Sequence, residues 1–178
     1  MARWGEKSLQ PISATSPVRG FTLLEVMLVM AILGLLAVTV SLALPESSQQ
    51  RLESEARRLK AQIGLVAEQA IYRNRDHGLW LGDAGYRFYR REKARWLPED
   101  ADSRLAAQAL NEGTTLRLRM AGQTVDTNGK EGEPQIFIAS DGQISEFELT
   151  LGHPDAQWPQ VIRASFAGDL RLVQAERP

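Results

Sequence analysis

The sequence predicts an α+β protein in which a long N-terminal helix packs on an antiparallel β-sheet head. Three observations carry this prediction. Almost every residue from Phe21 to Leu44 is apolar. An apolar stripe then recurs at helical spacing over 52–70. Short strand patterns separated by glycine-containing turns follow Gly78, and strands joined by short turns pair as antiparallel hairpins.

The apolar run from Phe21 to Leu44 contains one charged residue, Glu25, and stops at Pro45. As a helix rising about 1.5 Å per residue, it is long enough to cross a hydrocarbon core of about 30 Å. Helices that pack on a soluble core usually keep a polar face, which this run lacks. The sequence therefore predicts one membrane-spanning helix over 21–44.

A basic leader precedes this run, and the order of its parts differs from that of a secretory signal. Arg3, Lys7 and Arg19 come before the apolar segment, and so does the small-residue junction Gly20-Phe21. A secretory signal carries its small-residue cleavage site after the apolar region. Positive charge before a membrane helix favours a cytoplasmic N-terminus, so we expect the bulk of the chain on the opposite side of the membrane.

The stretch Gly20-Phe21-Thr22-Leu23-Leu24-Glu25 resembles the class III signal of type IV pilins and type II secretion pseudopilins. The resemblance implies that a prepilin peptidase cleaves between Gly20 and Phe21 and that the new amine of Phe21 is N-methylated. It also implies a single-pass protein of the bacterial inner membrane with a periplasmic head. The expected parts are a cleaved leader (1–20), a transmembrane assembly helix (21–44), a periplasmic half of the same helix (45–76) and a β-rich head (77–178).

Glu25 is expected to set the register of assembly. A charged group inside a membrane is costly unless it has a partner, and cleavage would leave a charged amine on Phe21. Pairing within one helix is difficult, because the two groups lie four residues apart at its frayed end. The family resemblance implies that this glutamate pairs with the terminal amine of a neighbouring subunit, as a buried polar residue fixes register in a coiled coil.

Composition excludes several classes of function. The 178 residues allow one ordinary domain besides the anchor, and the net charge of −1 gives no general sign of nucleic-acid binding. The chain has no cysteine, which excludes disulfides, thiol nucleophiles and cysteine-based metal sites. His77 and His153 lie far apart beside turn residues and are expected to be solvated. No nucleophile-elbow, phosphate-loop or zinc-protease motif occurs, so we expect no enzyme, no cofactor and no small-molecule substrate.

A second amphipathic stretch, from Glu46 to about Asn74, is expected to form a helix that packs on the sheet. Its apolar residues form one stripe: Leu52, Ala56, Leu59, Ile63, Val66 and Ala70. Polar residues occupy much of the rest of its surface: Arg51, Glu55, Arg58, Gln62 and Gln69. Joined to the membrane segment, this stretch would form one long helix that bends at Pro45.

The remaining chain is expected to form strands joined by turns and loops. The predicted strands are a hairpin over 79–89, a strand over 115–120, a hairpin over 135–151 and a final hairpin over 161–173. The turns of the last two contain Asp141-Gly142 and Gly168-Asp169, which suit tight turns that need positive φ. Between the strands we expect a loop over 90–102, a short helix over 103–110 and a mobile loop over 121–134.

The segment Pro134–Ser145, with alternating apolar residues after it, is similar to the C-terminal region of GspH-type minor pseudopilins. The resemblance implies a subunit near the tip of a periplasmic pseudopilus that links the I, J and K types of subunit to the major pseudopilin. The prepilin peptidase and the inner-membrane assembly platform would be its other partners. The major pseudopilin has a calcium loop, but Asp155 and Asp169 stand here without clustered carboxylates, so we expect no metal.

One alternative remains open, because the same family contains FimT/FimU-like minor pilins of type IV pili, some of which bind DNA. The run from Tyr86 to Trp96 interleaves aromatic residues with Arg90, Arg91 and Arg95, a pattern that can bind a single strand by charge and stacking. The part of the chain after Gly20 is acidic overall, which favours a solvated strand edge. We therefore expect no nucleic-acid partner.

Overall fold

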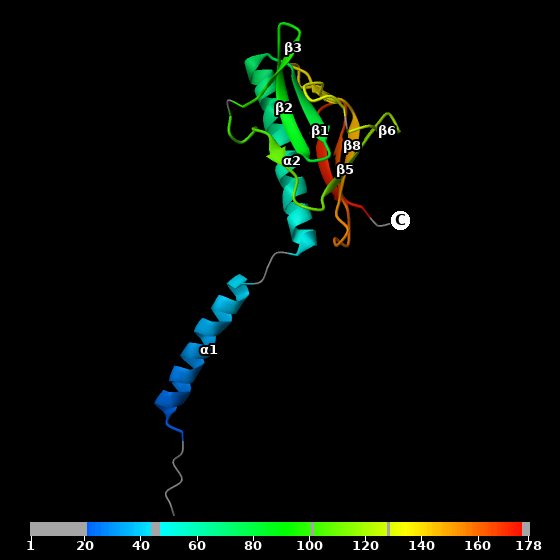
Figure 1. Cartoon of the computed structure of the whole chain (residues 1–178). Coiled ribbons are helices and arrows are strands. Elements are labelled where there is room, and N and C mark those ends of the chain that lie inside the picture. Colours follow the sequence, from blue (N-terminus) through cyan, green and yellow to red (C-terminus); the bar gives the residue numbers. More distant parts are fainter. Residues whose placement is uncertain (1–20, 44–46, 101, 128, 176–178) are drawn as a thin grey trace, which may run out of the picture. The chain divides into compact units, whose positions relative to one another are not determined.

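The computed structural model describes residues 21–43, 47–100, 102–127 and 129–175. The chain divides into two compact units, residues 1–45 and residues 46–178. Within these described residues, the first unit contains helix α1 and the second, here called the head, contains helix α2 and ten strands (Figure 1). The α+β prediction is confirmed, and the head folds around its own core.

Helix α1 spans Leu23–Ala43. Thr22 begins it, because the Thr22 hydroxyl oxygen accepts a hydrogen bond of 3.2 Å from the Glu25 N–H and the Thr22 carbonyl accepts one from the Val26 N–H. Among the described residues, no helix combines the length and the apolarity that crossing a membrane requires. The predicted bend at Pro45, and with it the continuity of one long helix, lies outside the described residues.

Helix α2 spans Ser48–Arg73 and carries signals at both ends. Ser47 and Gln50 form a capping box, in which each side chain accepts a hydrogen bond from the backbone N–H of the other residue. Asn74 ends the helix in the left-handed conformation, with φ of 47°. The predicted stripe is confirmed, because all six of its residues are buried in the core.

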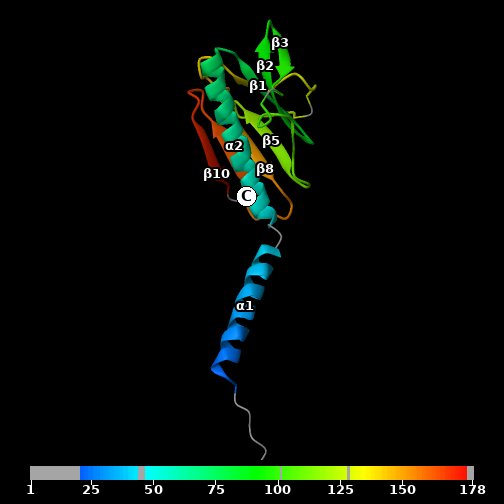
Figure 2. The same ribbon diagram turned by 90° about the vertical axis from the view of Figure 1, so that its left-hand side faces the viewer.

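The ten strands form two antiparallel sheets, and α2 packs against both (Figures 1 and 2). The first sheet has the order β3-β2-β1-β7, with β4 paired to β2: β1 (His77–Gly82), β2 (Gly85–Glu92), β3 (Arg95–Pro98), β4 (Gln108–Ala109) and β7 (Ile136–Ile138). The second has the order β10-β9-β8-β5-β6: β5 (Thr115–Met120), β6 (Gln123–Val125), β8 (Phe147–Gly152), β9 (Gln160–Ala164) and β10 (Leu170–Gln174).

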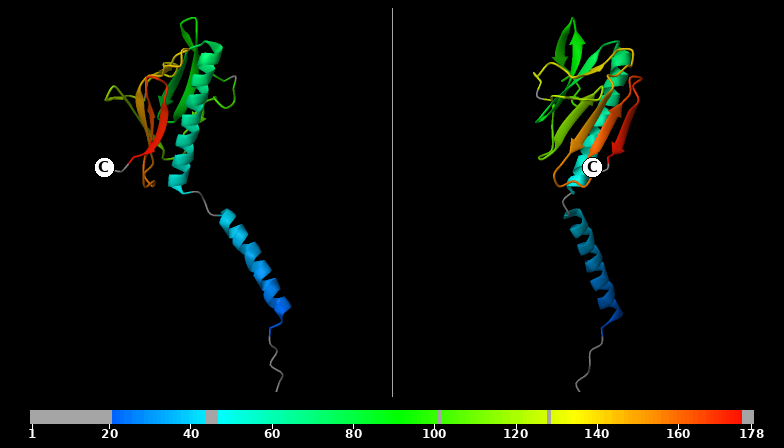
Figure 3. Two further views of the ribbon diagram at one scale, coloured as in Figure 1. Left: turned by 180° about the vertical axis from the view of Figure 1, so that it is seen from behind. Right: turned by 90° about the vertical axis from the view of Figure 1, so that its right-hand side faces the viewer.

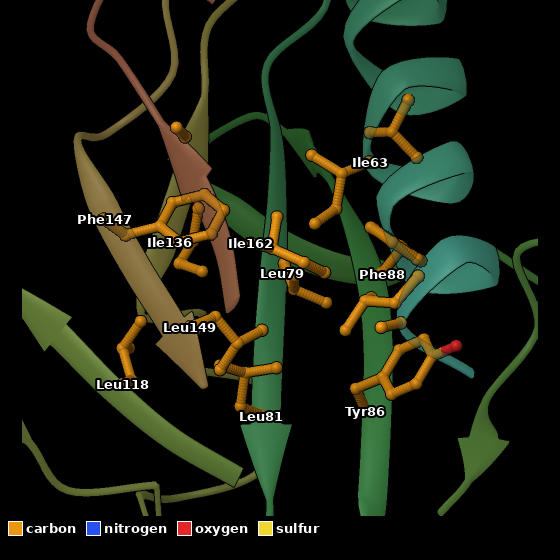
Figure 4. Packing of buried hydrophobic residues seen from close by; sticks show 14 of the residues in the cluster. Ile63, Leu79, Leu81, Tyr86, Phe88, Leu118, Ile136, Phe147, Leu149 and Ile162 are labelled. Atoms are coloured by element: carbon orange, nitrogen blue, oxygen red, sulfur yellow. The ribbon is translucent and has the colours of Figure 1, made fainter. Parts of the chain in front are cut away.

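The core lies between α2 and the inner faces of both sheets (Figure 4). Ile63 of α2 is fully buried, as are Leu79 and Phe88 of the first sheet and Leu149 and Ile162 of the second. Each such side chain contributes about 1.5–3 kcal/mol relative to exposure. One core shared by the two sheets explains why the head is a single unit.

Two expectations for residues 90–110 are wrong. The predicted loop over 90–102 is mostly strand, since β2 runs to Glu92 and β3 follows after two residues. Lys93 and Ala94 make this turn with φ of 45° and 66°, a conformation usually given to Asn or Gly. The predicted helix over 103–110 is instead a turn followed by β4. The backbone of β4 lies so close to Gly85 that any side chain at position 85 would collide with the Gln108 carbonyl.

Two further expectations are wrong in part. The 121–134 segment begins with a tight turn at Ala121-Gly122 and the strand β6, so it is not a loop throughout. The turn through Asp141-Gly142 forms, with Gly142 at φ of 90°. The strands on its two sides, however, belong to different sheets, because β7 pairs with β1 and β8 pairs with β5 and β9. The hairpins β1–β2 and β9–β10 are confirmed.

Candidate functional site

The predicted processing motif lies at the start of α1. Gly20 falls outside the described residues, whereas Phe21 is 80% exposed and Glu25 is also exposed. The Thr22 cap places Glu25 at the third position of the helix, where a carboxylate interacts favourably with the free N–H groups of the first turn. This geometry leaves the Glu25 carboxylate available to a group outside its own helix.

The described part of α1 presents apolar side chains on every face. The exposed apolar residues between Leu23 and Leu36 lie on all sides of the helix axis. They include Leu24, which is 74% exposed, Met27 at 67% and Leu35 at 69%. A helix that is apolar all round must cover its surface with lipid or with other helices. The α1 surface can therefore act as an assembly surface.

The head contains a buried carboxylate that the sequence pattern had assigned to the polar surface of α2. Glu55 is 2% exposed and accepts three hydrogen bonds from the loop before β5. The donors are the Asn111 N–H at 3.1 Å, the Asn111 side-chain amide at 3.1 Å and the Thr114 hydroxyl at 3.0 Å. Arg58 lies 3.9 Å from the same carboxylate. Glu55 thus fixes the first half of α2 to the loop that leads into β5 of the second sheet.

Gln62 forms a second buried polar centre and is likewise not part of the solvated face. The Tyr86 hydroxyl donates to the Gln62 side-chain carbonyl over 2.7 Å, and the Gln62 amide donates to the Arg104 carbonyl over 2.5 Å. Burial raises the pKa of Tyr86, so its hydroxyl keeps the proton that it donates. Arg104 in turn holds the pKa of Asp102 down to about 2 through direct hydrogen bonds. The centre joins α2, β2 and the turn before β4.

His77 forms a third centre, and the expectation that it is solvated is wrong. It begins β1, is fully buried and lies opposite Arg90 of β2 in the register. Its Nδ1 lies 3.0 Å from the Arg75 carbonyl, and its Nε2 lies 3.5 Å from Oε2 of the buried Glu99. Arg90 lies 3.8 Å from the other oxygen of Glu99. This cluster ties the ends of β1, β2 and β3 together.

His153 and the two aspartates considered for calcium lie in turns of the second sheet. The His153 imidazole is mostly enclosed, with 13% of its side chain exposed, so the solvated expectation is wrong here too. It accepts a hydrogen bond from the Asp155 N–H and lies 3.1 Å from the Glu112 carbonyl. Asp169 follows β9 in the turn to β10, where its N–H donates to the Ser165 hydroxyl. The hydrogen bonds of His153, Asp155 and Asp169 are therefore of the kind that stabilises turns.

The basic and aromatic run over 86–96 is a solvated strand edge only in part, because its last two residues lie on the edge strand β3, where Arg95 is exposed. β2 lies between β1 and β3, and its aromatic residues Tyr86, Phe88 and Tyr89 are buried. Arg90 donates to the Pro98 carbonyl over 2.7 Å and to Glu92 over 3.1 Å, while Arg91 lies over the Trp96 ring. Stacking on nucleotide bases needs exposed ring faces, and three of these rings have none.

Stability of the head is expected to fall as the pH drops below 6.5, the ordinary pKa of histidine, because of His77. Burial lowers the pKa of His77, with Glu99 opposing this effect, so the unfolded chain takes up a proton that the folded head resists. This contribution to stability is complete above pH 6.5 and is lost as the pH falls. Urea unfolding of residues 46–178 between pH 5 and pH 8 measures it.

The matched control for this prediction is His77→Asn, which keeps a donor for the Arg75 carbonyl but does not titrate. We expect the free energy of unfolding of this variant to depend less on pH than that of the wild type over the same range. Identical pH dependence in the two proteins would show that His77 does not carry the effect.

Two known families match this chain in successive segments. Residues 15–41 match the family described as prokaryotic N-terminal methylation motif. Residues 55–168 match the family described as type II transport protein GspH. The first match covers the predicted cleavage junction and most of α1, and the second covers the head from Glu55 in α2 to the turn before β10.

Curated relatives agree with these matches. The chain is 38% identical over 145 residues to Type II secretion system protein H of Pseudomonas aeruginosa, a match that covers 75% of this chain and 82% of that protein. It is 30% identical over 173 residues to the protein of the same name from Escherichia coli, covering 90% of this chain and 98% of the relative.

Solved structures show the same fold. The crystal structure of the minor pseudopilin EpsH from the type II secretion system of Vibrio cholerae aligns with a TM-score of 0.62 at 24% identity, covering 74% of this chain and all of that chain. The solution structure of Escherichia coli GspH aligns with a TM-score of 0.58 at 23% identity, covering 73% and 92%. The arrangement of a helix on two antiparallel sheets is therefore shared with minor pseudopilins.

Proposed function

We propose that this chain, which belongs to the type II transport protein GspH family and is a minor pseudopilin of a type II secretion system, lies near the tip of the periplasmic pseudopilus. There it links the I, J and K types of subunit to the major pseudopilin. The observation that carries the proposal is the combination, in one chain, of a methylation motif over 15–41 and a GspH-type head.

The N-terminal part is proposed to work as a cleaved and methylated assembly helix. Prepilin peptidase removes residues 1–20 at the Gly20-Phe21 bond, and Phe21 is then N-methylated. Residues 21–44 anchor the protein in the inner membrane, with the N-terminus in the cytoplasm and the head in the periplasm. Support comes from the methylation-motif match, the basic leader and the apolar side chains on every face of α1.

The head is proposed to act through contacts with other pseudopilins and with the inner-membrane assembly platform, not through chemistry. Its buried polar centres at Glu55, Gln62 and His77 join elements of its own core, which is a structural use of these side chains. We propose no catalysis, no cofactor and no nucleic-acid partner. The buried aromatic residues of β2 support the last of these points against the alternative of a DNA-binding type IV minor pilin.

Processing and assembly can be tested together in native membranes, because the chain has no cysteine of its own. Single cysteines placed in the head, followed by mild cross-linking and mass spectrometry, are expected to recover I-, J- and K-type pseudopilins and the major pseudopilin. The mature protein is expected to begin at an N-methylated Phe21 and to lack the mass of residues 1–20.

The cysteine-free parent serves as the control for cross-linking. A Gly20→Asp variant serves as the control for processing, because it puts a charged side chain at the scissile bond and is expected to keep its leader. Recovery of type IV pilus subunits in place of pseudopilins would contradict the assignment to secretion. An intact leader on the wild-type protein would contradict the cleavage site.

A further inference from the structure

The outer edge of β10 is one of the two open edges of the second sheet. β10 is the last strand in the order β10-β9-β8-β5-β6, and Figures 2 and 3 show it at the margin of the head. It pairs with β9 over all five of its residues without a bulge, from Leu170↔Ala164 to Gln174↔Gln160. β10 is therefore a regular strand with a partner on one side.

The pairing shows which backbone groups point outward. The Ala175 N–H donates to the Pro159 carbonyl, and the Asp169 carbonyl accepts from the Ser165 N–H. The backbone N–H and C=O groups of the odd-numbered residues of β10 therefore point toward β9. Backbone direction alternates along an antiparallel strand. The N–H and C=O groups of Leu170, Leu172 and Gln174 therefore face away from the sheet, and no described residue is hydrogen-bonded to them.

The other strand edges of the described head are protected in ways that β10 is not. β3 contains Pro98, and β6 is only three residues long. The free side of β7 is covered by Ser145, whose N–H donates to the Phe137 carbonyl. Proteins commonly protect edge strands by shortening them or by adding proline, lysine or a bulge. β10 carries one exposed charge, Arg171, but it has five residues and no proline, lysine or bulge, which makes it the edge best suited to accept a further strand.

A row of charges crosses the solvent face of this sheet and ends at the same edge. Arg119 of β5, Glu148 of β8 and Arg163 of β9 are in register, and Glu148 lies 3.6 Å from Arg119 and 2.9 Å from Arg163. Arg171 of β10 continues the row directly opposite Arg163. Arg171 forms no ion pair with any residue in the described part of the chain, so the row ends in two adjacent cations.

We infer that the outer edge of β10 binds an extended strand of a different pseudopilin and that this strand places an acidic residue opposite Arg171. The inference rests on the proposed function for the class of partner. Strand addition uses the outward backbone groups of Leu170, Leu172 and Gln174 for affinity, and the added acid supplies an opposite charge for Arg171. The described edge strands of this chain contain no Asp or Glu, so a second copy does not supply the acid.

Two matched pairs of variants in the full-length protein test the two parts of the inference. Gln174→Pro removes an outward N–H from an exposed position without breaking a hydrogen bond to β9, whereas Gln174→Ala keeps the N–H. Arg171→Glu reverses the charge, and Arg171→Lys keeps it. Recovery of cross-linked pseudopilins is expected to fall about fivefold for Gln174→Pro and Arg171→Glu. It should remain near the wild-type value for Gln174→Ala and Arg171→Lys.

A third pair locates the contact. Val173→Cys places a thiol on β10, and Arg117→Cys places one in the same register row but three strands away from the edge. Val173→Cys is expected to cross-link next to an acidic strand of another pseudopilin, and Arg117→Cys is not. Equal thermal unfolding midpoints of all variants confirm that each one folds.

The outcomes separate this inference from the proposed function. Wild-type yields from Gln174→Pro and Arg171→Glu, or a Val173→Cys cross-link to a second copy of this chain, would overturn the β10 contact while leaving the pseudopilin assignment intact. Failure of the wild-type protein to recover any pseudopilin would instead contradict the proposed function.

Discussion

Replacing Glu55 by alanine is expected to lower the free energy of unfolding of the head by about 4 kcal/mol. The carboxylate is buried and accepts three hydrogen bonds, from the Asn111 N–H, the Asn111 side chain and the Thr114 hydroxyl. Alanine removes the acceptors but leaves these donors in the protein interior, and a buried donor without an acceptor is more costly than a missing hydrogen bond. Urea unfolding of residues 46–178 measures the loss.

Two control variants distinguish this explanation from a general effect of charge on α2. Glu55→Gln keeps one side-chain oxygen as an acceptor and is expected to lose roughly half as much stability. Glu53→Ala removes a half-buried carboxylate two residues away that pairs with Arg57 at 3.5 Å, and it is expected to cost about 0.5 kcal/mol. If Glu55→Ala were no less stable than Glu53→Ala, the buried centre would have no structural role.

Replacing Glu25 by alanine is expected to reduce incorporation into the pseudopilus about tenfold. Under the proposed processing, the new amine of Phe21 would lie at the membrane boundary, and the Glu25 carboxylate, which is exposed on α1, would be available to a neighbouring subunit. Without the carboxylate, the amine of that neighbour would enter the helix bundle unpaired. The amount of this protein that is recovered with the major pseudopilin after cross-linking in membranes measures incorporation.

Glu25→Asp keeps the charge on a shorter side chain and is expected to retain most of the incorporation, whereas Glu25→Gln is expected to behave like alanine. Each variant must still lose residues 1–20, which mass spectrometry can establish, so that a defect in assembly is not mistaken for a defect in cleavage. Normal incorporation of Glu25→Ala would exclude a role of this residue in register.

Elements whose apolar residues repeat with a clear period could be predicted from the sequence. The stripe of α2 occupies one face of a helix, and the hairpins β1–β2 and β9–β10 alternate with turn residues between them. The turn at Lys93-Ala94 could not be predicted, because neither residue favours the positive φ that both adopt. The division of the predicted 135–151 hairpin between two sheets depends on strands that are remote in sequence, β1 and β5.

The candidate sites, like the elements of the fold, could be predicted where the signal lies in one stretch of sequence and were missed where it depends on remote residues. The proposed cleavage junction and Glu25 belong to one contiguous motif, so a single stretch of sequence was enough to propose them, and both remain predictions. The burial of Glu55 and Gln62 was missed, because a helical pattern places a polar residue on the surface by default, and that of His77 was missed because it lies beside a turn residue. Their partners lie far along the chain, as with Asn111 for Glu55, or just after another strand, as with Glu99, which follows β3, for His77. The open edge of β10 could be recognised only from the strand order.

The position of α2 in the fold has a consequence for the order in which the head can fold during synthesis. The helix lies early in the chain, yet the strands that it packs against include β8, β9 and β10, which are synthesised last. Contacts between segments that are remote in sequence form slowly, since a long loop must close first. The apolar stripe of α2 can therefore be covered only in part, by β1 and β7, while most of the head is being made, and the core is complete only when the final hairpin has formed.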